Sequence, residues 1–289
     1  MKIDDLASLQ SEFIGKLKSD APVFARIQEL RISDQAIHDN LGTLIDFQED
    51  FNYCQQCPGL EKCAKPTPHY EMGISFDGKF LDRKYSPCHR ITERMMMDAR
   101  YLVRDFPQPW EDCDLRKIDK TATRNPLVLV LTKILGGESK RWVFVRGKYK
   151  SGRSFILACF SNMYAASGHA PVAFCDASTL VERLKGLSIN DKKGFEKEFD
   201  SLCKAPLLVL DDFGNEFKSD FAFSTLLFPL LNYRSKNDLL TMFTSDFTIG
   251  EIGDMYSQKV APARGKQLSN LLSGLAESEF VLDGVTVYR

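Results

Sequence analysis

The sequence predicts an α/β protein, with a mainly parallel sheet in its C-terminal half and a smaller, mostly helical domain before it. In the second half, short apolar segments alternate with segments of helical spacing. A glycine-bearing loop, Gly147–Ser154, joins one apolar segment to a helix-compatible segment. Strands separated by helices are typical of a parallel sheet covered on both faces.

The composition is that of an ordinary globular protein. The chain has 289 residues, which is enough for two domains. Hydrophobic residues make up 44%, charged residues 27%, and the net charge is −1. This balance excludes a chain held on nucleic acid or on a membrane by its overall charge. We find no signal-peptide core and no apolar run near the length of a membrane span, so we expect a cytoplasmic protein without a membrane partner.

The first 50 residues are expected to be helical. Between Leu6 and Leu17, apolar residues recur with the spacing of one helix face. Further helices are expected after Pro22, after the capping residue Ser33, and over 41–51.

The segment from Cys54 to Cys88 is rich in proline, glycine and polar residues, so it has little to pack. A short hairpin is expected between Ile74 and Leu81, around Asp77-Gly78. Cys54 and Cys57 have the spacing of two thiolates on a tight turn, which suits one structural zinc ion. Cys88 is the expected third ligand.

The fourth zinc ligand is left open by ligand chemistry, because sites with four cysteines and sites with three cysteines and one histidine both occur. Cys63 and His69 compete for this place, and His89 is a weaker rival because it adjoins Cys88. The remaining cysteines are scattered and are expected to be small buried hydrophobic residues: Cys113, Cys159, Cys175 and Cys203.

The domains are expected to comprise residues 1–106, a helical zinc-binding domain, and residues 125–289, a phosphate-loop domain. Residues 107–124 are polar, charged and marked by proline, so we expect them to be the linker. The expected strands of the second domain are 142–146, 171–175, 207–211, 240–244 and 279–283, with helices that include Ser154–Ala166 and Ser219–Asn232.

The loop Gly147–Ser154 follows the pattern G-x-x-x-x-G-K-[ST], which wraps nucleotide phosphates with backbone N–H groups, except that Arg153 stands in the lysine position. Such a loop lies at a helix N-terminus, which favours anions. The nucleotide-binding candidates in the loop are Gly147, Lys148, Lys150, Ser151, Gly152, Arg153 and Ser154.

A second apolar segment, 206–212, ends in Asp211 and Asp212, as a strand that delivers an acid to Mg²⁺ does. Asp211 is expected to hold Mg²⁺ through water, together with the Ser154 hydroxyl. Asp212 is the candidate for orienting or deprotonating the attacking water. A third strand ends in Ser245 and Asp246, which are expected near the γ-phosphate of ATP or the phosphates of ADP.

Arginine in the lysine position puts this chemistry in question. Lysine is a compact point charge, whereas the arginine fork is wide and planar, so Arg153 is expected to meet phosphate from a different place. Lys150 occupies a loop position where glycine lets backbone approach the ligand. Lys148 and Lys150 are candidates for replacement charge. We therefore expect weak nucleotide binding and slow or absent hydrolysis.

Four runs carry a family resemblance: Leu210–Glu216 (LDDFGNE), Phe243–Phe247 (FTSDF), Val143–Phe155 and Tyr233-Arg234. They resemble the matching runs of the replicative helicase loaders of the DnaI/DnaC type, which are AAA+ proteins. The resemblance covers nearly the full chain. It implies an N-terminal zinc-bearing domain that binds a DnaB-type hexameric helicase, and it favours His69 over Cys63 as the fourth ligand. It also implies delivery of the helicase to single-stranded DNA, gated by ATP, with self-association on the helicase ring.

The chain departs from that family at three positions. Arg153 replaces the loop lysine, and Asp246 replaces a sensor asparagine. Asn270 and Leu271 stand where the resemblance places a trans-acting arginine, for which Arg264 is the nearest substitute. Because all three departures concern the γ-phosphate, they indicate a loader that has lost its ATPase step, or a viral or divergent relative of the family.

Two other functions compete with the loader. An active P-loop ATPase of another class, or a kinase, would use the same loop, although a lid-like arginine-rich segment is missing from the sequence. Plain DNA binding through a zinc ribbon is less favoured because the net charge is not basic. Candidate DNA contacts are Arg146, Lys148, Lys150, Lys192 and Lys193, with Trp110 and Tyr149 as stacking candidates.

Overall fold

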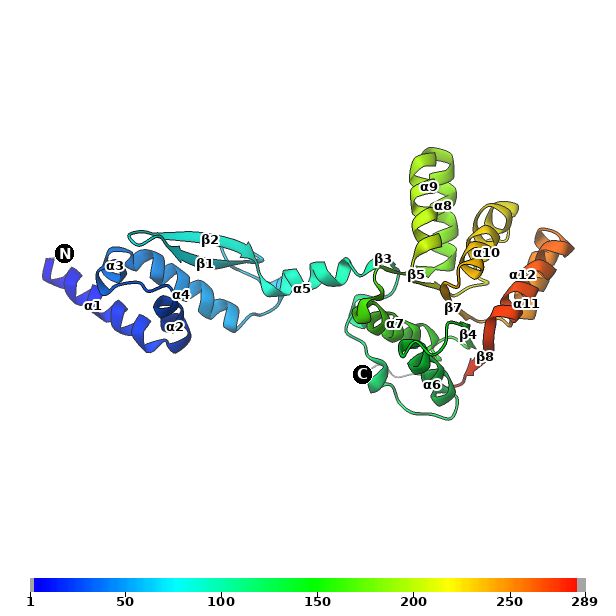
Figure 1. Ribbon diagram of the computed structural model, residues 1–289, viewed down its shortest axis with the longest axis horizontal. Coiled ribbons are helices and arrows are strands. Elements are labelled where there is room, and N and C mark those ends of the chain that lie inside the picture. The colour runs from blue at the N-terminus through cyan, green and yellow to red at the C-terminus, as the bar shows by residue number, and fades with distance from the viewer. Residues whose placement is uncertain (1–2, 285–289) are drawn as a thin grey trace. The chain divides into compact units, whose positions relative to one another are not determined.

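The computed structural model describes residues 3–284, with side chains from residue 10 onward. The chain divides after Met97 into two compact units, which are described separately (Figure 1). No helix within the described range is long and apolar enough to cross a membrane.

The first unit combines helices with a two-stranded hairpin. Its elements are α1 (Ile3–Ser19), α2 (Ala21–Glu29), α3 (Asp34–Asp39), α4 (Leu41–Gln55), η1 (Leu60–Lys62), β1 (Tyr70–Phe76), β2 (Leu81–Pro87) and α5 (His89–Asp98). The predicted cap is confirmed, because the Ser33 side chain accepts a hydrogen bond from the Ala36 backbone N–H at 3.2 Å.

The expected hairpin is present and longer than predicted. β1 and β2 pair antiparallel from Tyr70 opposite Pro87 to Phe76 opposite Leu81. The Asp77 carboxylate closes the turn by accepting hydrogen bonds from the backbone N–H groups of the two residues after Gly78. One face of the hairpin packs on the helices, where the buried core comprises Leu17, Val23, Ile27, Leu44, Phe47, Met72, Ile74 and Leu81, among others.

The second unit contains a six-stranded parallel sheet, in the order β3-β5-β6-β7-β4-β8. The strands are β3 (Tyr101–Arg104), β4 (Trp142–Gly147), β5 (Val172–Asp176), β6 (Leu207–Asp211), β7 (Leu240–Ser245) and β8 (Ala276–Leu282). The five predicted strands are confirmed, and β3 was missed. Because β6, β7 and β4 are neighbours, their carboxyl ends share one edge of the sheet.

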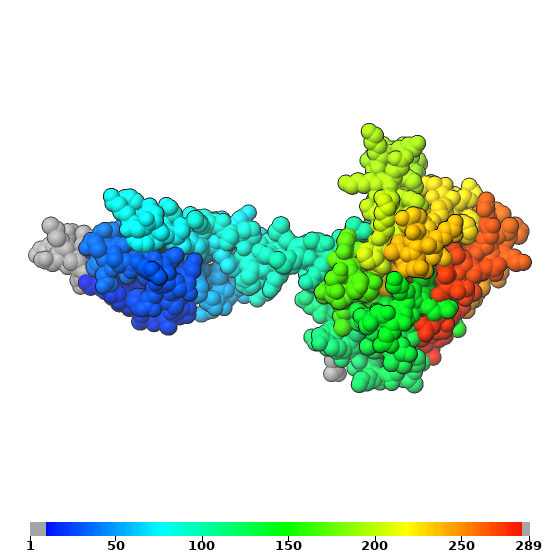
Figure 2. Space-filling model, viewed as in Figure 1, coloured from blue at the N-terminus to red at the C-terminus, as the bar shows by residue number. Residues whose placement is uncertain are grey.

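Helices cover both faces of this sheet, as predicted. They are α6 (Arg124–Leu135), α7 (Arg153–Tyr164), η4 (Ala165–His169), α8 (Ala177–Asn190), α9 (Lys192–Lys204), η5 (Phe221–Leu227), α10 (Phe228–Lys236), α11 (Ile249–Lys259) and α12 (Pro262–Leu275). Alternate strand residues face opposite cores: Phe144 and Leu210 pack in one cluster, Val145 and Val209 in the other. α8 and α9 project from the body of the unit (Figures 1 and 2).

The prediction of a linker over residues 107–124 is corrected by the structure. Residues 107–124 belong to the second unit, where η2 (Gln108–Trp110) and η3 (Leu115–Lys117) form short turns. The Trp110 ring lies edge-on to Phe155 of α7 at 5.5 Å, and Leu115 is buried in the core. The expected boundary at 106 is also displaced, because β3 adds to the sheet of the second unit. Apolar anchors within a polar segment therefore determine its packing.

Candidate functional site

The phosphate loop lies at the sheet edge where the sequence predicted it. β4 ends at Gly147, and α7 begins at Arg153 after Gly152, whose φ of +90° suits glycine. A Cβ at Gly147 would come within 2.6 Å of both the Leu282 carbonyl oxygen and the Ser151 Oγ, so only glycine fits there. Lys150 takes a left-handed conformation, with φ of +65°. The loop is thus tightly folded between β4 and α7.

The two acids at the end of β6 are held by the neighbouring strand. The Thr244 hydroxyl donates to the Asp211 carboxylate, and it accepts from the Asp212 backbone N–H at 2.9 Å. Burial raises the pKa of Asp211 to about 6, although hydrogen bonds from Thr244 and Ser154 oppose the rise. Asp212 has a φ of +51°, which is uncommon for a residue with a side chain.

The residue in the lysine position is turned toward β6 and β7. Arg153 has 7% of its side chain exposed, and its guanidinium contacts Asp212 Oδ1 at 2.6 Å and Asp246 Oδ1 at 2.7 Å. It also donates to the Gly147 carbonyl oxygen. Burial by itself would lower the pKa of Arg153, but the two carboxylates outweigh burial and raise it. The arginine therefore remains charged, and the charge is paired.

The end of β7 completes the cluster. The Asp246 Oδ2 accepts a hydrogen bond from the Asn215 side chain at 3.2 Å. The Ser245 hydroxyl donates to the Phe213 carbonyl oxygen at 2.6 Å, so Ser245 holds the β6 loop. Thr244 and Asn215 were not among the predicted site residues, although both lie in the runs that carry the family resemblance. Asp246 was expected beside a phosphate, and the structure places it on Arg153.

Other predicted site residues lie apart from this cluster. Lys150 Nζ is 5.5 Å from the centre of the Tyr149 ring, and Tyr149 is exposed. The Arg264 guanidinium lies over the Phe223 ring and approaches Gln267. Within residues 10–284, no hydrogen bond or ion pair joins Arg264 to Arg153 or to its two carboxylates. The structure thus brings together Arg153, the acids and Ser154, but not Arg264.

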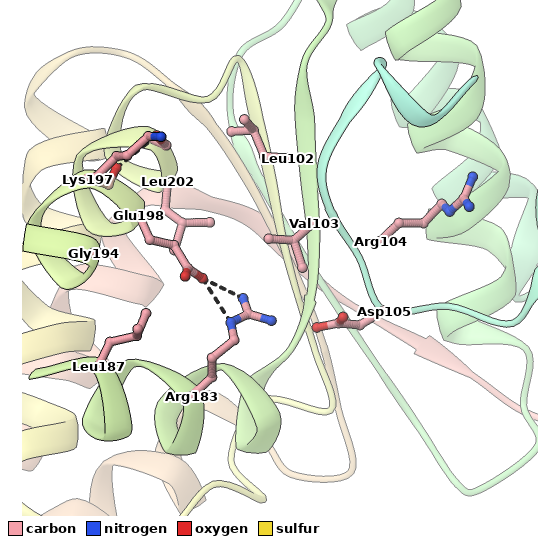
Figure 3. A pocket seen from close by; sticks show the side chains of 11 residues that line it. Leu102, Val103, Arg104, Asp105, Arg183, Leu187, Gly194, Lys197, Glu198 and Leu202 are labelled. Atoms are coloured by element: carbon pink, nitrogen blue, oxygen red, sulfur yellow. Dashed lines mark hydrogen bonds and ion pairs between the residues drawn. The ribbon is translucent and has the colours of Figure 1, made fainter. Parts of the chain in front are cut away.

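A groove of about 640 Å³ lies elsewhere in the second unit, between β3 and the pair α8–α9. Figure 3 shows the Glu198 carboxylate facing the Arg183 guanidinium, which it meets at 2.8 Å. Asp105 accepts from the Asp176 backbone N–H, and burial raises the pKa of its carboxyl group. Arg104 points away from the groove and pairs with Asp98 and Glu111. No sequence pattern predicted this groove.

In the first unit, the candidate zinc ligands converge on one small cavity. Its lining includes Cys54, Cys57, Cys63, His69 and Cys88. Among the described residues, no three histidine, cysteine or acidic side chains are placed so as to hold one metal ion. All of these cysteines are free thiols. The donor set has the chemistry that zinc prefers, and the side chains would have to turn to reach a common ion.

Several of these donors have partners already. Lys65, with 4% of its side chain exposed, contacts Asp50 at 2.6 Å and donates to Cys54 Sγ at 3.3 Å. Burial raises the pKa of the Cys54 thiol, with Lys65 opposing the rise. His69 Nε2 lies 3.0 Å from the Leu60 carbonyl oxygen. Cys63 and His69 both line the cavity, so both remain candidates for the fourth ligand.

Comparisons with known proteins find helicase loaders and, among the solved structures, also DnaA replication initiators. No family model matches the chain. The replicative helicase loader DnaI of Bacillus subtilis (strain 168) is 22% identical over 250 residues, which span 83% of this chain and 79% of that protein. A crystal structure of DnaI is 23% identical, with a TM-score of 0.54, and covers 65% of this chain and 97% of that one. A crystal structure of the DnaC helicase loader is 19% identical, with a TM-score of 0.51, and covers 61% and 100%.

These comparisons confirm two predictions. The chain resembles the DnaI/DnaC-type loaders, and its second unit has the AAA+ fold with a parallel sheet.

Proposed function

We propose that this protein is a helicase loader. It binds a DnaB-type hexameric replicative helicase and helps to deliver that helicase to single-stranded DNA in the cytoplasm during replication initiation. The observation that carries this proposal is the similarity to a helicase loader over 83% of the chain, which is too long a stretch to be confined to either unit.

The proposed division of labour follows from the two units. The first unit lacks the loop and acids of a nucleotide site, so binding of the helicase is assigned to it. Its surface carries exposed aromatic side chains on the hairpin, including Phe80 and Tyr85, which suit a protein contact. We assign to the second unit the binding of single-stranded DNA and the self-association on the helicase ring.

Structural zinc is part of this proposal. Cys54, Cys57 and Cys88 would hold the ion with either Cys63 or His69, since all five line one cavity. Through its ligands, zinc would cross-link the end of α4 to the end of β2. Segments of this kind, which bury few apolar residues, commonly depend on their metal for folding.

Nucleotide handling is proposed to be weak, and hydrolysis to be slow or lost. Ser154 and Asp211 lie together, as residues that hold Mg²⁺ beside a nucleotide do. Asp212, the candidate for orienting water, is instead paired with Arg153 at 2.6 Å. The same pairing makes an active ATPase or kinase the less favoured alternative. A steady ATPase rate that is lost in Asp212→Asn would support that alternative.

The direct test is co-purification of the full chain with a DnaB-type hexamer. We expect a complex that survives size-exclusion chromatography, and transfer of the helicase onto single-stranded DNA covered by binding protein. The matched control is the same experiment with an unrelated hexameric ATPase. Absence of a complex with several DnaB-type helicases, including that of the source organism, would reject the proposed function.

A further inference from the structure

We propose that Arg153, Asp212 and Asp246 form an internal ion cluster that closes the nucleotide-binding edge, and that Asp246 determines the rejection of nucleoside triphosphates there. This inference deepens the proposed weakness of nucleotide handling and rests on that part of the proposed function, but it does not depend on the helicase.

Arg153 links three strand ends. Its guanidinium meets one oxygen from the end of β6, one from the end of β7 and the carbonyl of the last residue of β4. These three strand ends form the edge at which a phosphate loop and its acids hold Mg²⁺ and phosphates. The arginine therefore links the same three elements that a bound nucleotide would link. A phosphate that took Arg153 would have to displace two carboxylates from it.

The ion cluster has more acids than bases. Arg153 carries one positive charge, whereas Asp212 and Asp246 carry two negative charges at hydrogen-bond distance from it. The cluster is thus net negative where a triphosphate would arrive. In an ordinary loop the corresponding lysine is available to the β- and γ-phosphates. Here that charge is neutralised, and Lys148 and Lys150 are the loop cations that remain.

Asp246 is the acid whose charge can be removed with the least other change. Asp212 is also the candidate for orienting the attacking water, so a change there would alter hydrolysis as well as charge. Asp246 lies at the other side of Arg153, with 41% of its side chain exposed. Asparagine has the same shape and can still accept a hydrogen bond from Arg153. The change therefore removes one charge and leaves Arg153 with one carboxylate instead of two.

The experiment measures binding of a fluorescent ATP analogue with Mg²⁺ to the full chain, in the absence of helicase and DNA. We expect the wild-type chain to show no saturation below about 1 mM, and Asp246→Asn to bind at least about tenfold more tightly, as removal of one like charge allows. The double variant Arg153→Lys with Asp246→Asn should bind more tightly still. The matched control is Asp254→Asn, which makes the same chemical change at an exposed position of α11.

Two results would overturn the inference. One is a folded Asp246→Asn variant that binds the analogue no better than the wild type does. The other needs no variant: wild-type chain that binds Mg-ATP in the micromolar range, seen as a thermal shift of several degrees at about 1 mM nucleotide. Neither measurement contains helicase. A negative result in either one can therefore be told apart from a failure of the chain to form a complex with the helicase.

Discussion

Replacing Asp211 with asparagine is expected to stabilise the second unit at neutral pH. Asp211 ends β6 and accepts a hydrogen bond from Thr244, and burial raises the pKa of its carboxyl from 3.8 to about 6. A raised pKa means that the fold favours the protonated, neutral carboxyl. Asparagine is neutral at every pH, has nearly the same shape and can still accept from Thr244. The variant therefore removes the cost of ionising a buried acid.

The size and sign of the effect follow from proton linkage. Between pH 3.8 and about 6, the folded chain retains a proton on Asp211 that the unfolded chain has released. The free energy of unfolding of the wild type therefore falls as pH rises through this window, and this contribution is constant above it. A shift of about two pKa units corresponds to about 3 kcal/mol. Because the side chain is partly exposed, we expect about 1–3 kcal/mol of stabilisation in Asp211→Asn at pH 7.

Tryptophan fluorescence is a suitable assay, since Trp110 and Trp142 are the two tryptophans and both lie in the second unit. Urea unfolding from pH 4 to pH 8 should show the gain of Asp211→Asn growing with pH up to about 6 and then levelling. Asp254→Asn is the control and should show no such gain. A variant that is less stable than the wild type at pH 7, or a gain that is independent of pH, would refute the reasoning.

Three further predictions concern other parts of the chain. Arg234 is fully buried, and its guanidinium donates to four backbone carbonyls and the Thr241 hydroxyl, so Arg234→Met should lower the free energy of unfolding by about 3–5 kcal/mol in the same fluorescence assay. Metal analysis should find about one zinc per chain. If Cys63→Ser loses the zinc, Cys63 is the fourth ligand, and if His69→Asn loses it, His69 is. Thr248→Ala should cost about 1 kcal/mol by thermal unfolding, because Thr248 and Glu251 form a capping box on α11.

Much of the second unit could be predicted because its strands are short apolar runs that end in polar residues. The loop, Asp211 and Asp212 were placed at one sheet edge from sequence spacing alone, and the sheet order β6-β7-β4 agrees. β3 was missed because it is only four residues long and lies in a polar surrounding. Its partner β5 begins about 70 residues later, so no local sequence pattern predicts that the two strands pair.

The pairing of Arg153 with Asp246 could not be predicted, because 93 residues separate the two. The sequence showed each as a separate departure from a phosphate-handling pattern. Only the fold shows that the two unusual residues neutralise each other. For the cysteine cavity the limit is different: sequence and structure both bring the five donors together, and neither selects between Cys63 and His69.

The loader function is tested most sharply by the interaction of the nucleotide-free full chain with a DnaB-type helicase hexamer. We predict that the purified chain contains no bound nucleotide and still forms the complex, and that Arg153→Ala and Asp246→Asn do not abolish it. A complex that forms only when this chain binds and hydrolyses ATP, shown by its loss in Asp212→Asn, would contradict a loader with weak nucleotide handling.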